Sequence, residues 1–434
     1  MTLSHSTVTD LFTDIASTIR SKTGSNSPIV ADAFPTAINA INVMTDIDKA
    51  NVGIFNGQYT RINLSNTMSL PAGPICSVTQ EWCDSFSGIG AGQFFQKFFN
   101  NSNDWTFTNV MYVSNYAFYN GGTTAMGYHF NNFNFPGCSY IGSNAFYASN
   151  IASINAPRCT SIDISAFAFC SLTTASFPSC TSIGNSAFFG CSSLTTANFS
   201  ACTKISQYAF ANCFSLTSIS FPACTSIADN VFARCSKLTS VSFPSCQSIG
   251  YSAFVSCSAL SSISFPTCSV IGSYGFYKCI SLVEANFPSC TKMFDMVFNN
   301  DTSLISVSFP NCTSIGTYVF ASCYSLSNVY LPVCKSIGQY TFGYCSQLST
   351  VSFPDCTYIG YQAFQNCFNL LSLYLMGSSL CSLANTNAFT STPISNYTTS
   401  TGGVYGSIYV PASLLASYKA STNWVTYSSR FVGV

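Results

Sequence analysis

Apolar residues and cysteines recur along the middle of the chain in a frame of 22 residues. A clean copy runs from Phe243 to Ser264 and has the form F-P-x-C-x-x-I-G-x-x-A-F-x-x-C-x-x-L-x-x-I-x. A fixed period of this length predicts a solenoid, in which each copy is one coil that buries its apolar side only by stacking on its neighbours. Ser200 replaces the proline of the frame once, and the proline itself recurs at Pro136, Pro157, Pro178, Pro222, Pro244, Pro266, Pro288, Pro310, Pro332 and Pro354.

The first part of each coil is predicted to be a short strand. Leu260, Ile263 and Phe265 follow the pattern L-x-x-I-x-F, in which alternate residues of the strand point inward. Pro266 ends the strand because proline has no N–H to continue a ladder. With neighbouring strands about 4.8 Å apart, the eleven coils of the frame would form a rod of roughly 50 Å.

The second part of each coil is predicted to turn the chain back. Ile271 begins another extended piece, and Gly272 allows a turn with positive φ. Residues 273–279 predict about one helical turn, in which Phe276 and Cys279 share a face because they are three residues apart. Stacking of such coils places like residues on one another in columns.

Residues 1–110 do not follow the frame. Leu11, Ile15 and Ile19 recur every four residues, which predicts a helix, and residues 33–41 predict a second short helix. This N-terminal part is therefore a small helical module, or alternatively an oligomerisation seam. Beyond it, residues 46–110 predict a few strands and supply the cap that the open end of the array needs.

The frame is lost again toward the C-terminus. Residues 408–410 predict a last strand that Pro411 stops, and residues 412–418 predict a helix. Trp424 and Tyr427 are expected to pack over the final coil. The predicted units are a helical attachment module (1–45), an irregular β-containing linker and N-terminal cap (46–110), the repeat solenoid (111–376) and a C-terminal cap (377–434).

Three stretches resemble two known families. The strand L-x-x-I-x-F followed by I-G-x-x-A-F-x-x-C resembles the BspA-like class of bacterial leucine-rich repeats over residues 111–376, and YVPASLLASYKASTNWVTYSSR resembles the C-terminal cap of such arrays. The resemblance implies a β-rich α+β solenoid and an association with surface adhesion and binding. Residues 11–41, LFTDIASTIRSKTGSNSPIVADAFPTAINAI, resemble a short N-terminal module of tail and minor structural proteins of phages that infect Gram-positive bacteria.

Charged residues make up only 6% of the chain, with 14 basic and 14 acidic side chains. The chain has no basic run to neutralise phosphates, so we expect no binding to nucleic acid. It has no run of about 20 apolar residues, so we expect no membrane span. The first residues lack a basic region and carry Asp10 and Asp14, so we expect no signal peptide.

The 23 cysteines fall into two columns of the frame, apart from Cys76, Cys83 and Cys381. A disulfide framework is one interpretation, because stacked cysteines would lie within bridging distance. Bridges would have to alternate between coils, however, and Asp301 interrupts the second column. We therefore expect buried free thiols and no disulfides, as suits a reducing cytoplasm or an anaerobe.

The sequence contains no catalytic or metal-binding motif. A Ser/His/Asp site needs a histidine, and His129 is the one near the array, without an acid nearby in sequence. The cysteine spacing gives no C-x-x-C pair for zinc. We therefore expect no enzyme, metal or cofactor. The acidic residues of the array occupy different positions of the frame in different coils, so no two are expected to converge. They are Asp163, Asp229, Glu284, Asp295, Asp301 and Asp355.

Two surfaces are candidates for binding a ligand. The first is the strand face, where outward serines form a hydroxyl ladder and solenoids commonly bind, although serine also simply suits a solvated strand. The ladder changes toward the C-terminal end at Glu284, Asn286, Asn328, Tyr330 and Tyr374. The second is the turn before each Ala-Phe pair, where tyrosines resemble a paratope or only shield the coil edge. These tyrosines are Tyr208, Tyr251, Tyr274, Tyr318, Tyr340 and Tyr361.

These features favour a non-enzymatic recognition protein. The first hypothesis is a phage tail-associated adhesin, made in the host cytoplasm and carried on the virion. Residues 1–45 would attach to a tail or baseplate protein, and the solenoid would contact a bacterial surface glycan or protein. The alternatives are a bacterial cell-surface adhesin of the same repeat class and a structural spacer without a ligand. The sequence does not determine the oligomeric state, and a homo-oligomer is one of the possibilities.

Overall fold

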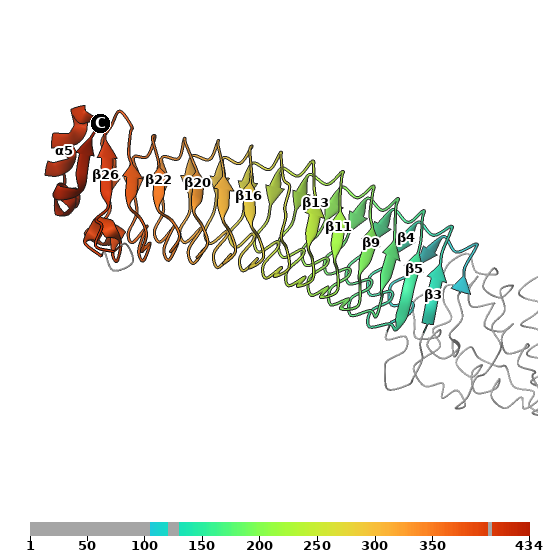
Figure 1. Cartoon of the computed structure of the whole chain (residues 1–434). Coiled ribbons are helices and arrows are strands. Elements are labelled where there is room, and N and C mark those ends of the chain that lie inside the picture. Colours follow the sequence, from blue (N-terminus) through green and yellow to red (C-terminus); the bar gives the residue numbers. More distant parts are fainter. Residues whose placement is uncertain (1–104, 120–129, 398–401) are drawn as a thin grey trace, which may run out of the picture.

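The computed structural model describes residues 105–119, 130–397 and 402–434. These residues form one solenoid, with short strands following one another along its length (Figure 1). The predicted helices of residues 1–45, nearly all of the predicted linker and His129 lie outside the described residues. The division of the chain at residues 45, 110 and 376 stays a prediction.

The I-G part of each coil forms a continuous parallel sheet of 13 strands, each of two residues. Eleven of them belong to the coils of the frame, and the first and last belong to coils that lack the proline. The strands are β2 (Tyr112–Val113), β4 (Tyr140–Ile141), β6 (Ser161–Ile162), β8 (Ser182–Ile183), β10 (Lys204–Ile205), β12 (Ser226–Ile227), β14 (Ser248–Ile249), β15 (Val270–Ile271), β17 (Lys292–Met293), β19 (Ser314–Ile315), β21 (Ser336–Ile337), β23 (Tyr358–Ile359) and β25 (Ser382–Leu383).

The L-x-x-I-x-F part of the coils forms the strand face, which is divided into four parallel sheets. The first contains β1 (Trp105–Thr106), β3 (Phe130–Asn134), β5 (Ile151–Asn155), β7 (Thr174–Ser176) and β9 (Thr196–Asn198). The second contains β11 (Ser218–Ser220) and β13 (Ser240–Ser242). The third contains β16 (Glu284–Asn286), β18 (Ser306–Ser308) and β20 (Asn328–Tyr330). The fourth contains β22 (Thr350–Ser352), β24 (Ser372–Tyr374), β26 (Ser407–Val410) and β27 (Phe431–Gly433).

The strand predicted around Ile263 is reduced to a single bridge between Ser240 and Ser262. The division of the strand face has a counterpart in the core. Stacked rings are 5.8 Å apart between Phe243 and Phe265 on the strand side, and 5.3 Å apart between Phe232 and Phe254 on the turn side. The coils therefore open slightly on the strand side, which weakens the ladder there.

The prediction of a helical turn at residues 273–279 is wrong, because the segment is a run of β-turns. Tyr274 and Lys278 have φ of 61° and donate their N–H groups to carbonyls of the next coil. Gly275, Tyr277 and Cys279 instead donate to the residue three before them in the same coil. Phe276 also donates its N–H to the next coil, to the carbonyl of Val297, so three of the six backbone hydrogen bonds of the turn are made between coils. A local pattern cannot reveal such partners. The shared inward face of Phe276 and Cys279 is confirmed, since both are fully buried.

The role expected for Gly272 is also wrong, because its φ is not positive. A Cβ at this residue would lie 2.8 Å from the backbone carbon of Gly250 in the preceding coil. At Gly338 the clash would be closer, 2.3 Å from the carbonyl oxygen of Gly316. The glycine of the frame therefore allows neighbouring coils to approach each other, rather than allowing an unusual turn.

The 21 cysteines of the described residues are all buried free thiols. In the first column each thiol donates to the carbonyl two residues on, as Cys180 does to Ser182 at 3.3 Å. In the second column it donates to a phenylalanine carbonyl of the preceding coil, as Cys235 does to Phe210 at 3.1 Å. Burial raises the pKa of Cys180 to about 11, so this thiol stays protonated.

The C-terminal residues cover the last coil. The rings of Trp424 and Tyr427 lie 5.9 and 5.4 Å from that of Phe389, as expected from the sequence. Trp424 is completely buried and donates through Nε1 to the carbonyl of Cys381 at 2.7 Å. The short helices of this part are η4 (Thr386–Phe389), η5 (Pro393–Ser395), η7 (Ala412–Leu414), α5 (Leu415–Ala420) and η8 (Trp424–Arg430).

Candidate functional site

The strand-face candidates lie on three strands in the C-terminal half of the array. Glu284 and Asn286 are the two exposed residues of β16, and Asn328 and Tyr330 are those of β20. Because β16, β18 and β20 pair in register, Asn286 and Tyr330 lie in one row and Glu284 and Asn328 in a parallel row. The structure therefore brings these four side chains onto one sheet. Tyr374, on β24, belongs to the next sheet and is half-buried.

The row continues into the C-terminal residues through Tyr409, a tyrosine that is not among the residues predicted from the sequence. Tyr409 on β26 pairs in register with Tyr374, and the two rings stack with centroids 4.4 Å apart. The sequence does contain the information needed to find Tyr409. If the insertion between the two strands is left out of the alignment, the last strand before Pro411 places Tyr409 at the position of Tyr374. The two rings form a flat aromatic surface at the C-terminal end of the strand face.

Two exposed apolar side chains were also missed. Val283 and Ile305 are 45% and 44% exposed and lie on adjacent coils, joined by the bond from the Ile305 N–H to the Val283 carbonyl. In most other coils this position holds threonine or serine, and several of these hydroxyls donate to the preceding coil, as Thr217 does to Thr195 at 3.3 Å. This second row of hydroxyl groups, at the position after the leucine, is thus interrupted by two apolar side chains next to Glu284. The signal in the sequence was the residue after the leucine of each copy.

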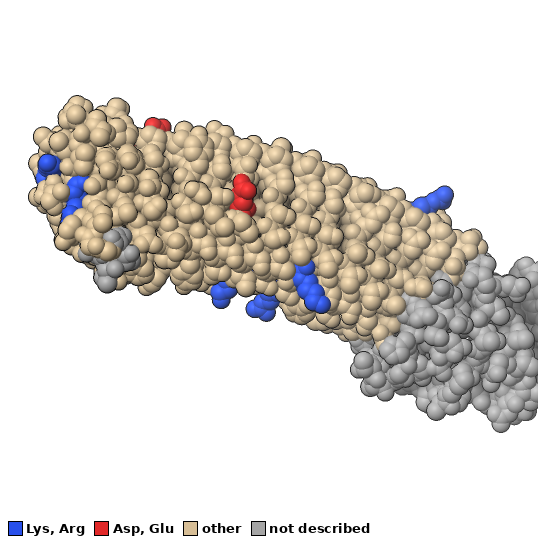
Figure 2. Space-filling view, in the orientation of Figure 1, with Lys and Arg blue, Asp and Glu red and all other residues tan. Residues whose placement is uncertain are grey.

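The surface around these residues is almost without charge. Figure 2 shows a few isolated basic and acidic side chains on a face made of other residues. Glu284 is exposed, and it is the acidic residue of β16. A ligand at this surface would therefore meet one carboxylate among amide, phenol and apolar groups.

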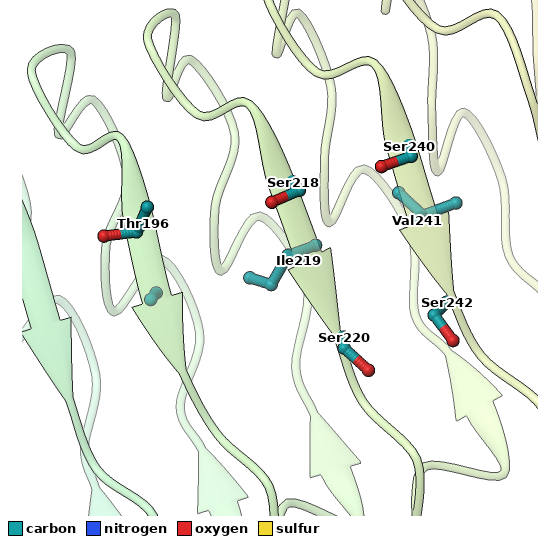
Figure 3. A pocket seen from close by; sticks show the side chains of 8 residues that line it. Thr196, Ser218, Ile219, Ser220, Ser240, Val241 and Ser242 are labelled. Carbon is teal, nitrogen blue, oxygen red and sulfur yellow. The ribbon is translucent and has the colours of Figure 1, made fainter.

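The N-terminal half of the strand face carries a shallow, open groove instead. It spans β9, β11 and β13 at the place where the first two sheets separate (Figure 3). Its rims are serine hydroxyls in register across the strands, and its floor is apolar. The groove is lined by Thr196, Ala197, Ser218, Ile219, Ser220, Ser240, Val241 and Ser242.

In the tyrosine row, the predicted tyrosines of the turns before each Ala-Phe pair, several rings contact one another. Tyr318 and Tyr340 stack at 4.8 Å, and Tyr361 meets Tyr340 edge-on at 6.0 Å. Tyr251 and Tyr274 meet edge-on at 5.5 Å, and Tyr208 is 42% exposed at the other end of the row. Slight burial, followed by the neighbouring phenols, raises the pKa of Tyr340. Neighbouring rings of the row therefore contact one another, while Tyr208, Tyr251 and Tyr361 remain exposed.

Four acids of the array, Asp163, Asp229, Asp295 and Asp301, accept hydrogen bonds within the fold. Asp229 Oδ1 accepts the N–H of Tyr251, and Asp295 Oδ1 accepts that of Thr317, both at 2.8 Å. In the described residues no group of three or more His, Cys, Asp or Glu side chains could hold a metal ion. The helices of this part of the chain are all too short or too polar to cross a membrane.

The repeat identifies a family. The model of the BspA type leucine rich repeat region matches residues 111–239, 225–334 and 313–405, which together exceed half of the chain. The chain belongs to this family. BspA-type leucine-rich repeats are a non-catalytic repeat family. No curated protein matches the chain.

The chain is also similar to solved structures. A leucine-rich repeat protein from Bacteroides ovatus is 21% identical, with a TM-score of 0.60 over 80% of this chain and 88% of that one. A leucine rich cell surface protein from Faecalibacterium prausnitzii is 21% identical, with a TM-score of 0.38 over 75% of this chain and 87% of that one. The pneumococcal vaccine antigen PcpA is 16% identical, with a TM-score of 0.43 over 77% and 88%. The likeness to the Bacteroides protein shows the leucine-rich repeat fold.

Proposed function

We propose that this chain is a non-enzymatic recognition protein that binds a bacterial surface glycan or protein through the C-terminal half of its strand face. One observation carries the proposal: the outward residues of the strands change along the array while the inward pattern stays the same. Ser218 and Ser220 of β11 are exposed around a buried Ile219, and Glu284 and Asn286 of β16 are exposed around a buried Ala285. The fold does not require this change, so we attribute it to a ligand.

The chemistry of the changed region suits a ligand with both polar and apolar groups. Tyr330 is 56% exposed, and the stacked rings of Tyr374 and Tyr409 continue the surface. Tyrosine gives a large contact area with little loss of conformational entropy, and asparagine offers both a donor and an acceptor. Sugars present hydroxyls and apolar ring faces, and a protein surface presents amides and aliphatic side chains. Val283 and Ile305 add apolar area to the same face.

Binding to intact cells tests the proposal. The fluorescent full-length chain would be incubated with a panel of Gram-positive bacteria, beside a variant with Glu284, Asn328, Tyr330 and Tyr374 changed to alanine. We expect saturable binding to some strains and at least about tenfold weaker binding of the variant, because centrally placed aromatic residues carry most interface energy. Competition by isolated wall polysaccharide would identify a glycan ligand, and loss of binding after protease treatment of the cells would identify a protein ligand.

The chain offers a matched control. Changing Ser218, Ser220, Ser240 and Ser242 to alanine removes four outward hydroxyl groups from the N-terminal half of the same face, where the groove lies. This control should bind as the unmodified chain does. Equal weakening by both variants would contradict the assignment to the C-terminal half. A folded chain that binds no strain would favour the spacer, and weakening only by alanine at Tyr208, Tyr251 and Tyr361 would favour the tyrosine row.

The biological setting is a separate proposal. BspA-type leucine-rich repeat proteins are typically cell-surface proteins, which supports a bacterial adhesin. The resemblance of residues 11–41 to phage modules supports our first hypothesis, attachment through residues 1–45 to a phage tail or baseplate. Electron microscopy with an antibody against the array separates the two settings. Label on particles supports the phage tail, and label on cell envelopes but never on particles would contradict it.

A further inference from the structure

Two buried thiols meet where the regular array joins the C-terminal residues. The Sγ atom of Cys381 lies 3.7 Å from that of Cys356 in the preceding coil and donates a hydrogen bond to it. Cys381 is fully buried and Cys356 is 4% exposed. A disulfide needs a separation of about 2.05 Å, so the two sulfur atoms would have to move about 1.7 Å closer to form a bond.

The meeting of these thiols has a cause in the chain. Cysteines of the first column follow one another every 21 or 22 residues, as Cys334 and Cys356 do, whereas Cys381 comes 25 residues after Cys356. Because Ser382 pairs in register with Tyr358, Cys381 stands one residue before its strand, where Cys356 stands two before.

The shift removes the usual acceptor. A regular thiol donates to the carbonyl two residues on, as Cys356 does to Tyr358 at 3.3 Å. For Cys381 that carbonyl belongs to Leu383, and it already accepts from the side chain of Asn423 at 2.7 Å. The thiol of Cys381 is left with Cys356 and with the carbonyl of Ser382, which is also 3.7 Å away.

The C-terminal residues hold the backbone of Cys381 on both sides. Its N–H donates to the hydroxyl of Tyr418 at 3.0 Å, and its carbonyl accepts from Trp424 Nε1 at 2.7 Å. Both partners belong to the segment that covers the last coil. A covalent link at Cys381 would therefore fasten this segment to the array.

We propose that Cys356 and Cys381 are a redox-reactive pair that closes to a disulfide when the chain meets a low-molecular-weight disulfide such as oxidised glutathione. The hydrogen bond from Cys381 lowers the pKa of Cys356 and raises that of Cys381, so Cys356 is the first to form a thiolate. This proposal is independent of the ligand surface. It requires an oxidising setting, such as the outside of a cell.

The reaction balances in two exchanges. The thiolate of Cys356 attacks one sulfur of the oxidised glutathione, which forms a mixed disulfide and releases one glutathione thiolate. The thiolate of Cys381 then attacks the Cys356 sulfur, forms the protein disulfide and releases the second glutathione. The two protein thiols lose two electrons and two protons, and the two glutathione molecules receive them.

Peptide mapping of the intact, full-length chain tests the pair. The chain is incubated with oxidised glutathione, its remaining thiols are blocked with N-ethylmaleimide in denaturant, and it is digested with chymotrypsin without reduction. Chymotrypsin is needed because no lysine or arginine lies between the two cysteines. We expect a linked peptide of Cys356 and Cys381 before any other cysteine pair reacts, and its loss on treatment with dithiothreitol.

Two variants make the assignment specific. Cys381→Ser should stop the reaction at a glutathione mixed disulfide on Cys356, whereas Cys334→Ser, one coil away, should leave the link unchanged. A link between Cys290 and Cys312, or full N-ethylmaleimide labelling of Cys356 and Cys381 after other cysteines have reacted, would overturn the proposal. If the Cys381 variant fails to fold, the map of the unmodified chain still decides.

Discussion

At the scale of single residues, each core ring belongs to two interfaces at once. Phe254 is fully buried and stacks on Phe232 at 5.3 Å and on Phe276 at 5.1 Å, with interplanar angles of 11° and 2°. A cavity at this position cannot be filled by collapse of one coil, because the backbone hydrogen bonds between coils fix their separation. Burial in columns therefore makes each coil depend on both of its neighbours.

Phe254→Ala should cost about 3–5 kcal/mol in unfolding free energy, because it removes a ring from the middle of a column and leaves a cavity. Urea unfolding followed by circular dichroism measures the loss. Lys237→Ala, at an exposed site of the preceding coil, is the control and should have little effect. An equally small change for Phe254→Ala would mean that the stacked rings do not determine stability.

Asp301 gives a second prediction at this scale. It occupies the place of a cysteine in the second column and is fully buried, with Oδ1 accepting the Cys279 N–H at 2.8 Å and Oδ2 without a partner. Burial raises the pKa of this carboxyl well above 3.8, more than the hydrogen bond from Cys279 lowers it. The folded chain therefore holds a proton that the unfolded chain releases as the pH rises above about 4.

Stability from Asp301 is therefore present below about pH 4 and is lost as the pH rises through the pKa of the folded state, by up to about 1.4 kcal/mol per pH unit. Asp301→Cys restores the column and removes this titration. We expect the melting temperature of the variant to exceed that of the unmodified chain by an amount that grows between pH 5 and pH 8. Parallel curves for the two proteins would show that Asp301 has an ordinary pKa.

At the scale of elements, the sequence could predict which residues are inward. The frame placed Phe276, Cys279 and their equivalents in the core, because burial repeats with the period of the sequence. It could not predict the conformation of the turn. The left-handed residues Tyr274 and Lys278 are stabilised by hydrogen bonds to the next coil, and propensities along one coil contain no information on such partners.

The C-terminal element gives the next prediction. Phe389 stacks on Phe364 at 5.4 Å on one side and is covered by Trp424 and Tyr427 on the other. Removal of residues 377–434 would expose Phe364 and the open edges of two sheets. Such a chain should aggregate, because exposed apolar surface and unpaired strands invite association. Size-exclusion chromatography with light scattering measures this, and a monomeric truncated chain of unchanged stability would contradict the role of a cap.

At the scale of the whole molecule, the candidate site was predictable only in part. Glu284, Asn328 and Tyr330 were recognisable because they depart from serine at outward positions of the frame. To predict Tyr409, one has to know the strand register across an insertion. To predict Val283, one has to know that the position after the leucine is exposed. Substitutions at outward positions of the regular frame could therefore be recognised from the sequence. Residues beyond the last regular copy could not, because the frame no longer gives their register.

The near absence of charge yields the last prediction. The 14 basic and 14 acidic residues balance, and those on the face in Figure 2 are isolated from one another. Charges interact over about 10 Å at 0.1 M salt, so a surface of this kind exerts little long-range attraction on a ligand. Affinity for the responding cells should change by less than about threefold between 50 and 500 mM sodium chloride, since packing and hydrogen bonds are only weakly screened. Titration of the fluorescent chain at both salt concentrations measures this. A steep loss of affinity with salt, retained by the variant without Glu284, would assign binding to residues outside the strand face.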